Sequence, residues 1–152
     1  MTIVLARKPE EMLSFRQITT IASTDPITLK EFFENPSIRM SPSFERLLYS
    51  PERSSNSILI ARYHLRNAAK DSDLSSLFPK GRITGVAFLA ALIERDKDRR
   101  ERELGKRGLP NILYLDHCSV SAVWQIGHWF LDVHSLDERY WPQGTRIFVP
   151  PQ

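Results

Sequence analysis

The chain has 152 residues and a mass of 17.6 kDa, with 41% hydrophobic and 26% charged residues. A chain of this length buries about two thirds of its unfolded surface as one domain, whereas two separate domains would each have a thin core. We therefore expect a single domain spanning residues 1–152. The formal net charge of +3 and the pI near 9.2 permit a nucleic-acid partner without requiring one.

Several classes of protein are excluded by what the sequence lacks. No apolar run approaches the roughly 18 residues that a membrane helix requires, so we expect no membrane partner. The first residues, MTIVLARKP, carry charge too early for a secretory signal. The lone Cys118 excludes an intramolecular disulfide and fits a reducing compartment. These features together predict a cytoplasmic protein.

The basic residues are strongly biased toward arginine, with fifteen Arg against six Lys. Guanidinium groups stack on planar rings and bind phosphates with two parallel hydrogen bonds, which ammonium groups do not. The bias therefore favours an anionic or planar ligand. A genome rich in G and C also encodes arginine-rich proteins, so both explanations stay open.

The N-terminal part of the chain predicts a strand and then helices. Residues 2–6 are apolar and suit a short strand, and residues 9–20 are expected to form a short helix. Thr28 and Glu31 make a capping box, which predicts a second helix that ends at Asn35.

A third helix is marked by Ser41 as its N-cap, with Pro42 in the first turn. We expect this helix to end before Pro51. Residues 53–57 then form a loop, and the apolar, β-rich run ILIARYHL at 58–65 predicts a buried strand.

The middle of the chain is harder to assign. Residues 67–78 suit a loop or a short helix. Residues 82–94 are ambiguous, because their alanines and leucines favour a helix while the segment ITGV favours a strand. Residues 96–107 carry interleaved charges of both signs, and only Leu104 could be buried, so they predict an exposed charged insertion.

The C-terminal part predicts β structure and holds all three tryptophans. Trp124 and Trp129 are five positions apart, so on a regular strand they point to opposite faces, and only one of them can line a binding surface. The expected strands lie at residues 111–115 and 119–124, followed by an aromatic pair at 124–136 and 141–150 joined by a Pro/Gly turn.

The order of these elements resembles ASCH domains of the PUA-like superfamily. The similar segments are the strand ILIARYH, the segment GRITGVA, a variable stretch and a closing WxxGxWFL…L…PxG hairpin, together covering residues 58–150. The resemblance implies an α+β fold built on a small mixed β-barrel (PUA-like) with flanking helices. It also implies that residues 82–90 form a strand.

The resemblance further implies a nucleic-acid-binding module for RNA or a modified nucleotide, with DNA also compatible. Arg39, Arg62 and Arg82 flank the region where these domains have their ligand-binding cleft, so we predict that these arginines bind the nucleic acid. Trp124 is the predicted stacking residue, because stacking a base on an aromatic ring contributes about 1 to 3 kcal/mol.

Two other functions stay open. Some ASCH proteins hydrolyse acylated cytidines, so one alternative is a small hydrolase acting on a nucleoside-like amide. The family signature Gly-x-Lys-x-x-Thr/Glu-x-Arg keeps only its arginine here, within residues 35–39. Because hydrolysis needs an activated nucleophile and a positioned base, we assign no catalytic residues and favour a protein that is not an enzyme.

The second alternative is an accessory or inhibitory protein that binds another protein through residues 94–107.

The remaining reactive residues favour ordinary structural roles. His117 and Cys118, with His128 and His134 downstream, lack the paired spacing of a structural zinc site. Cys118 with His128 as base could form a thiol nucleophile, although a single cysteine is more often a small core residue. Asp132 suits a solvated strand end. We also find no phosphate-binding Gly-rich loop and no G-x-S-x-G elbow, and we expect no metal and no cofactor.

Overall fold

The computed structural model describes residues 9–22, 26–48, 57–97, 104–105, 108–136 and 139–152. The helices are α1 (Pro9–Met12), α2 (Pro26–Phe33), α3 (Pro42–Leu47), α4 (Asp71–Ser75) and α5 (Val86–Lys97). The strands are β1 (Leu13–Ala22), β2 (Ile38–Met40), β3 (Ser57–Leu65), β4 (Ala69–Lys70), β5 (Asn111–Tyr114), β6 (Cys118–Gln125), β7 (His128–Ser135), β8 (Tyr140–Trp141) and β9 (Arg146–Val149).

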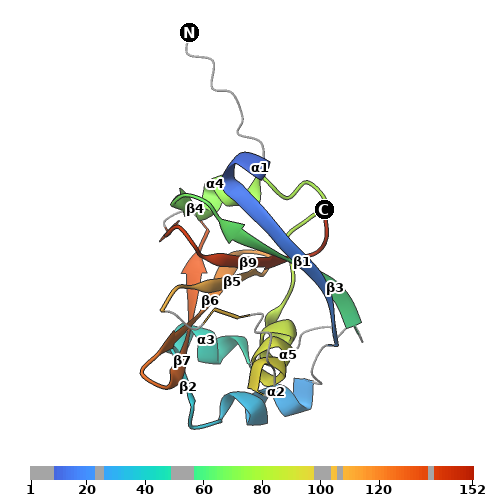
Figure 1. Ribbon diagram of the computed structural model, residues 1–152. Coiled ribbons are helices and arrows are strands. Elements are labelled where there is room, and N and C mark those ends of the chain that lie inside the picture. The colour runs from blue at the N-terminus through green and yellow to red at the C-terminus, as the bar shows by residue number, and fades with distance from the viewer. Residues whose placement is uncertain (1–8, 23–25, 49–56, 98–103, 106–107, 137–138) are drawn as a thin grey trace.

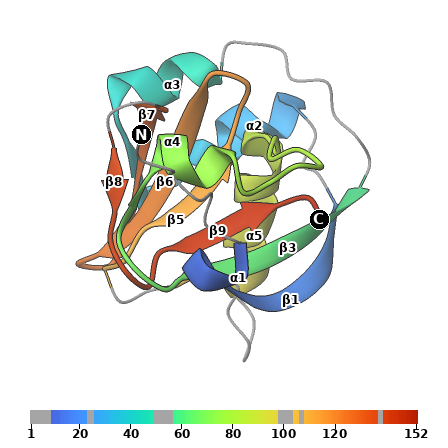
Figure 2. The same cartoon turned by 90° about the horizontal axis from the view of Figure 1, so that it is seen from above.

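Seven strands form one sheet in the order β1-β3-β9-β5-β6-β7-β2, and β4 pairs with β8 in a second sheet (Figure 1). The pairs β5 with β9 and β2 with β7 are parallel, and the other pairs are antiparallel. The C-terminal strand β9 therefore lies inside the sheet, between β3 and β5 (Figure 2). The predicted α+β class is confirmed. β1 and β2 are the edge strands, and within the described residues no pairing between them closes a barrel.

The large sheet separates two hydrophobic cores. Helices α2, α3 and α5 lie against one face, which we call the helical face, and α1 and α4 lie against the other, which we call the Asp71 face (Figure 1). Side chains alternate along each strand, so a single strand supplies both cores. On β9, Phe148 is buried on the helical face, and Ile147 and Val149 are buried on the Asp71 face.

The helix predicted over residues 9–20 is wrong beyond Met12. The chain turns once in α1 and then forms β1, which pairs with β3 along its whole length. β-branched residues such as Ile18 and Thr19 lose side-chain freedom in a helix and pack well in a strand. Pairing with the apolar β3 therefore outweighs the local helical tendency. The strand expected at residues 2–6 lies outside the described residues.

The strand predicted over residues 82–90 is also wrong, because Val86 begins helix α5. Only Ile83 forms a β-bridge, with Tyr114, and Gly85 then separates it from the helix at a φ of 105°. The first five residues of α5 are all buried. An apolar run buried on every side does not reveal its period, and here the helix fits the space between the sheet and α2.

The C-terminal hairpin differs from the predicted one. Its strands are β6 and β7, joined by Ile126 and Gly127, whose φ values of 49° and 76° are typical of a two-residue type I′ turn. β9 does not pair with β7; it pairs with β3 and β5. Trp124 and Trp129 face each other directly across the hairpin, so the prediction that they point to opposite faces is wrong.

Other predicted elements are confirmed. Ser41 caps α3, where its Oγ accepts a hydrogen bond from the Phe44 N–H at 3.1 Å. The strands expected at residues 58–65, 111–115 and 119–124 correspond to β3, β5 and β6. Helix α2 forms as well, although it begins at Pro26, ahead of the expected capping box.

The charged segment at residues 96–107 is anchored at two points. Asp96 and Leu104 are 2% and 1% exposed, and the Leu104 N–H donates to Oδ2 of Asp96 at 2.8 Å. The prediction of an exposed insertion is therefore wrong at Asp96, whereas Leu104 is the one residue of the segment that was expected to be able to bury. Residues 98–103 and 106–107 lie outside the described part of the chain.

Across the described ranges, none of the helices is long and apolar enough to cross a membrane.

Candidate functional site

A set of polar side chains gathers on the Asp71 face of β5, β6 and β7. The register places Ser121 opposite Asp132 and Ser119 opposite His134, so these four side chains share one side of the sheet. Tyr114 of β5 is paired with Ser119 and belongs to the core on the same face. The pleat of three adjacent strands thus concentrates hydroxyl, carboxyl and imidazole groups in one place.

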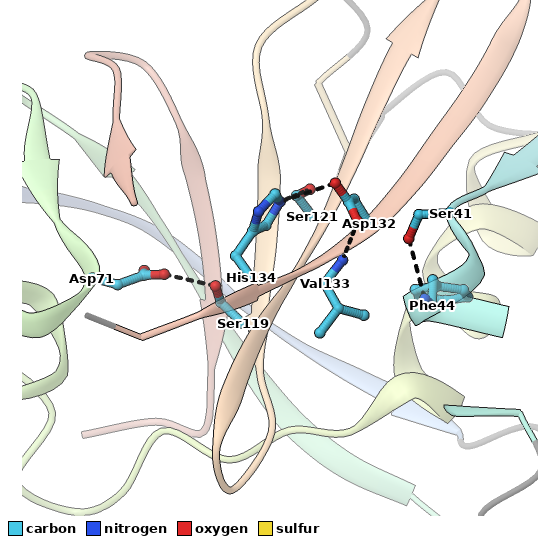
Figure 3. Close-up of polar contacts among 8 residues, drawn as sticks. All are labelled: Ser41, Phe44, Asp71, Ser119, Ser121, Asp132, Val133 and His134. Carbon is cyan, nitrogen blue, oxygen red and sulfur yellow. Dashed lines mark hydrogen bonds and ion pairs between the residues drawn. The ribbon is translucent and has the colours of Figure 1, made fainter. Parts of the chain in front are cut away.

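The carboxyl group of Asp71 is the centre of this set. Asp71 is the first residue of α4 and is fully buried. It accepts a hydrogen bond from Ser119 Oγ at 2.6 Å (Figure 3). It also accepts hydrogen bonds from Tyr114 Oη at 3.0 Å and from Trp141 Nε1. Burial and the charge of Asp71 hold the pKa of Tyr114 well above its usual value, which keeps the phenol a donor. Three neutral donors therefore satisfy a buried acid.

His134 lies beside this network on β7. Its Nε2 is 2.9 Å from Ser121 Oγ and 4.0 Å from Oδ2 of Asp132 (Figure 3). Its ring meets that of Trp141 edge to face, with 5.2 Å between centroids. Burial lowers the pKa of His134, more than the neighbouring Asp132 raises it. The imidazole is therefore neutral at pH 7 and hydrogen-bonds the Ser121 hydroxyl.

Ser121, His134 and Asp132 are the residue types of a hydrolytic triad, but their geometry is different. In a triad, the nucleophile and the carboxylate contact different ring nitrogens of the histidine. Here both approach Nε2. Ser121 is also only 4% exposed, which leaves a substrate carbonyl little access to its Oγ. This arrangement is suited to holding β6 against β7 and not to acyl transfer.

An open groove of about 630 Å³ lies at the edge of the sheet, where β2 meets β7. Arg39 and Phe130 are direct neighbours in the parallel register, and both are exposed, with Phe130 at 39%. The His128 ring lies 6.4 Å from the Phe130 ring, centroid to centroid, and extends the aromatic surface toward the hairpin turn. The groove is lined by Arg39, Met40, Ser41, Phe130, Leu131 and Asp132.

Backbone hydrogen bonds hold the groove in shape. The Ser41 N–H donates to the Leu131 carbonyl at 2.9 Å, and the Trp129 N–H donates to the Ser37 carbonyl at 2.8 Å, which fixes β2 against β7. Oδ1 of Asp132 accepts from the Val133 N–H at 2.8 Å, while half of the Asp132 side chain stays exposed. The groove therefore presents a guanidinium, an aromatic ring and a carboxylate from rigid strands.

Two of the four predicted site residues lie on the Asp71 face. Arg39 lines the groove. Arg82 lies in the segment before α5, with its guanidinium carbon 5.7 Å from the centroid of the Tyr114 ring. Tyr114 is itself fully buried in the Asp71 network, so Arg82 lies at the far side of that network from the groove.

The other two lie on the helical face. Arg62 is paired with Phe148, and Trp124 packs against Trp129 with 5.2 Å between ring centroids. Trp124 is half-buried against the core of that face. The four predicted residues therefore do not form one cleft, because the sheet separates Arg39 and Arg82 from Arg62 and Trp124.

Phe130 is the residue of the groove that the sequence did not reveal. In the segment HWFLDVH at residues 128–134, residues 129, 131 and 133 point into the core of the helical face. Residues 128, 130, 132 and 134 point to the Asp71 face. This alternation can be recognised in the sequence and could have identified Phe130. The stacking role was instead predicted for Trp124, because the tryptophans are the largest aromatic residues of this region.

Within the described residues, no group of three His, Cys, Asp or Glu side chains could hold a metal ion. His128 and His134 are separated along β7, and Cys118 pairs with Ser135 at the other end of the hairpin from His128. Burial raises the pKa of the Cys118 thiol, which disfavours the thiolate that a nucleophile requires.

Comparison of the chain with family models, with curated proteins and with solved structures finds no match.

Proposed function

We propose that this protein binds single-stranded RNA or a modified nucleotide in the groove between β2 and β7. The observation that carries the proposal is the direct juxtaposition of Arg39 and Phe130 in one open groove. Exposed aromatic rings beside cationic side chains are what sequence-tolerant binding of single strands requires. The formal charge of +3 agrees with an anionic partner.

Each groove residue has a distinct role in this proposal. The Phe130 ring stacks on a base, and the Arg39 guanidinium contacts a phosphate. The exposed carboxylate of Asp132 lies two residues along the same strand, on the same face as Phe130. It can accept a hydrogen bond from an exocyclic amino group, so it favours bases that carry one.

Membership of the ASCH and PUA-like group stays a proposal. It is supported by strand β3, by the tryptophan-rich hairpin and by Arg39, the one residue of the family signature that this chain keeps. Helix α5 counts against it, because residues 86–90 were expected to pair as a strand. The hydrolase alternative gains no support from the Ser121 and His134 geometry described above.

The test is the affinity for labelled single-stranded RNA, measured by fluorescence anisotropy over a series of salt concentrations. Arg39→Gln should weaken binding and make the slope of log affinity against log salt shallower by about 0.7, because one phosphate contact is lost. Phe130→Ala should cost about 1 to 3 kcal/mol with little change in slope, since stacking releases no counterions.

Matched controls are available outside the groove. Lys80→Gln removes the same charge from an exposed position, and Phe15→Ala removes an aromatic ring that is 54% exposed on β1. Both should bind RNA like the wild type. The proposal is wrong if the wild type binds neither RNA nor single-stranded DNA at low salt, or if the controls lose as much affinity as the groove variants.

A further inference from the structure

A second concentration of positive charge lies on the helical face, beyond the end of its hydrophobic core. On β3, Ile60 belongs to that core, while the next side chains on the same face, Arg62 and His64, do not. Arg146 of β9 is the direct partner of His64. We call this set, with the neighbouring residue of β1, the His64 cluster: Arg16, Arg62, His64 and Arg146.

The fourth member, Arg16, lies at a β-bulge in β1. In the pairing of β1 with β3, Phe15 is opposite Tyr63 and Gln17 is opposite Arg62, so Arg16 is the extra residue. Bulges are frequent beside functional sites. The positive charge of Arg16 is one of the causes that lower the pKa of His64.

The imidazole of His64 is in an unusual environment. Its Nε2 is buried and makes no hydrogen bond to the described residues. Burial and then the charges of Arg146, Arg16 and Arg62 lower the pKa of His64 to about 4. A buried polar atom without a partner costs free energy and calls for an explanation. Three cations around one imidazole point to an anion as the missing partner.

Among the described residues, other elements packed nearby do not supply a carboxylate to His64. From α5, Arg95 donates to the Thr20 carbonyl and Asp96 accepts from the Leu104 amide. Asn111 of β5, the partner of Arg146, hydrogen-bonds Gly105 and the Ala122 carbonyl. The charges that shift the pKa of His64 are all arginines.

We propose that the His64 cluster is a binding site for a phosphate group. Guanidinium groups bind phosphate oxygens with paired hydrogen bonds, and a protonated Nε2 adds a further donor. The site lies across the sheet from the Arg39 groove and shares no residue with it, so the proposal does not depend on RNA binding there. Free phosphate and the phosphate of a nucleic-acid backbone have the same chemistry and are separated by the test below.

The test is a titration of the wild-type protein with inorganic phosphate, followed by the NMR signals of the His64 ring, with chloride at equal ionic strength as the reference. Phosphate should bind saturably and raise the pKa of His64 above about 4, because the anion offsets the arginines. Arg62→Gln and Arg146→Gln should each weaken phosphate binding at least about tenfold, as expected for losing a charge-assisted hydrogen bond.

Lys80→Gln removes an equal charge elsewhere and should bind phosphate like the wild type. A single-stranded RNA that shifts the His64 signals identifies a backbone phosphate as the ligand, whereas a response to inorganic phosphate alone identifies a free anion. The proposal is overturned if phosphate and chloride have the same effect at equal ionic strength, or if both arginine variants bind phosphate as tightly as the wild type.

Discussion

At the scale of single residues, Asp71 connects elements that are far apart in the sequence. Its carboxyl group joins α4 to β5, β6 and β8 through Tyr114, Ser119 and Trp141. All four side chains are buried. The stability of the Asp71 face therefore depends on one acid and its three donors.

We predict that Asp71→Ala lowers the free energy of unfolding by at least about 3 kcal/mol, because it leaves three buried donors unsatisfied. Asp73 lies in the same turn of α4 but is exposed, so Asp73→Ala should change stability by less than about 0.5 kcal/mol. Urea unfolding of both variants checks this. Equal losses would show that the network adds nothing beyond the charge at the start of α4.

His64 predicts how stability depends on pH. Its pKa in the folded protein is about 4, below the unfolded value of 6.5, so the unfolded chain takes up the proton first as the pH falls. Stability from this residue is fully present above pH 6.5 and is lost between there and about pH 4. His64→Gln should therefore flatten the pH dependence of unfolding in this window, whereas His117→Gln, at an exposed position, should follow the wild type. Parallel curves for all three proteins would contradict the pKa shift.

At the scale of elements, the turn between β6 and β7 is strained. Ile126 is 94% exposed and adopts a φ of 49°, which β-branched residues rarely do. Asparagine tolerates this conformation and is favoured in type I′ turns.

We predict that Ile126→Asn raises the free energy of unfolding by about 1 kcal/mol, the cost of one strained residue. Ile126→Val keeps the β-branch and should give no gain. Thermal unfolding of the two variants distinguishes them. A destabilised Ile126→Asn protein would mean that the exposed isoleucine makes a contact that the turn geometry does not explain.

The charged segment after α5 gives another element-scale prediction. Residues 98–103 have the sequence DRRERE and contain no apolar side chain, so replacing them with a Gly/Ser linker should leave the protein folded. Leu104→Ala should instead cost about 2 to 5 kcal/mol, because Leu104 is buried in the core of the helical face. Circular dichroism and urea unfolding report both outcomes. Loss of folding in the linker variant would show that the replaced residues are structural.

Sequence signals that depend only on neighbouring residues correctly predicted helix α3 and strand β3. The cap at Ser41 and the apolar run of β3 were recognisable from the sequence because each depends on neighbouring residues. The assignment of residues 13–20 failed because β1 is stabilised by its pairing with β3, whose residues lie 35 to 52 positions further along the chain. The assignment of residues 86–90 failed because a fully buried apolar run has no visible period.

At the scale of the whole molecule, the sheet brings together segments that are distant in the chain. β2 and β7 are separated by about ninety residues and form the groove by parallel pairing. Composition and periodicity do not predict which distant strands pair. Arg39 was therefore predicted from the sequence as a binding residue, while its position beside Phe130 was not predicted. The same sheet separates Arg62 and Trp124 from the groove by placing them on the other face.

The groove at β2 and β7 is tested most directly by mapping the amide NMR shifts of the labelled protein during titration with a single-stranded RNA. We predict that the largest changes occur at residues 39–41 and 130–132, together with broadening of the Phe130 ring signals. Shift changes confined to β1 and β3, or no changes at low salt, would contradict the proposed binding site.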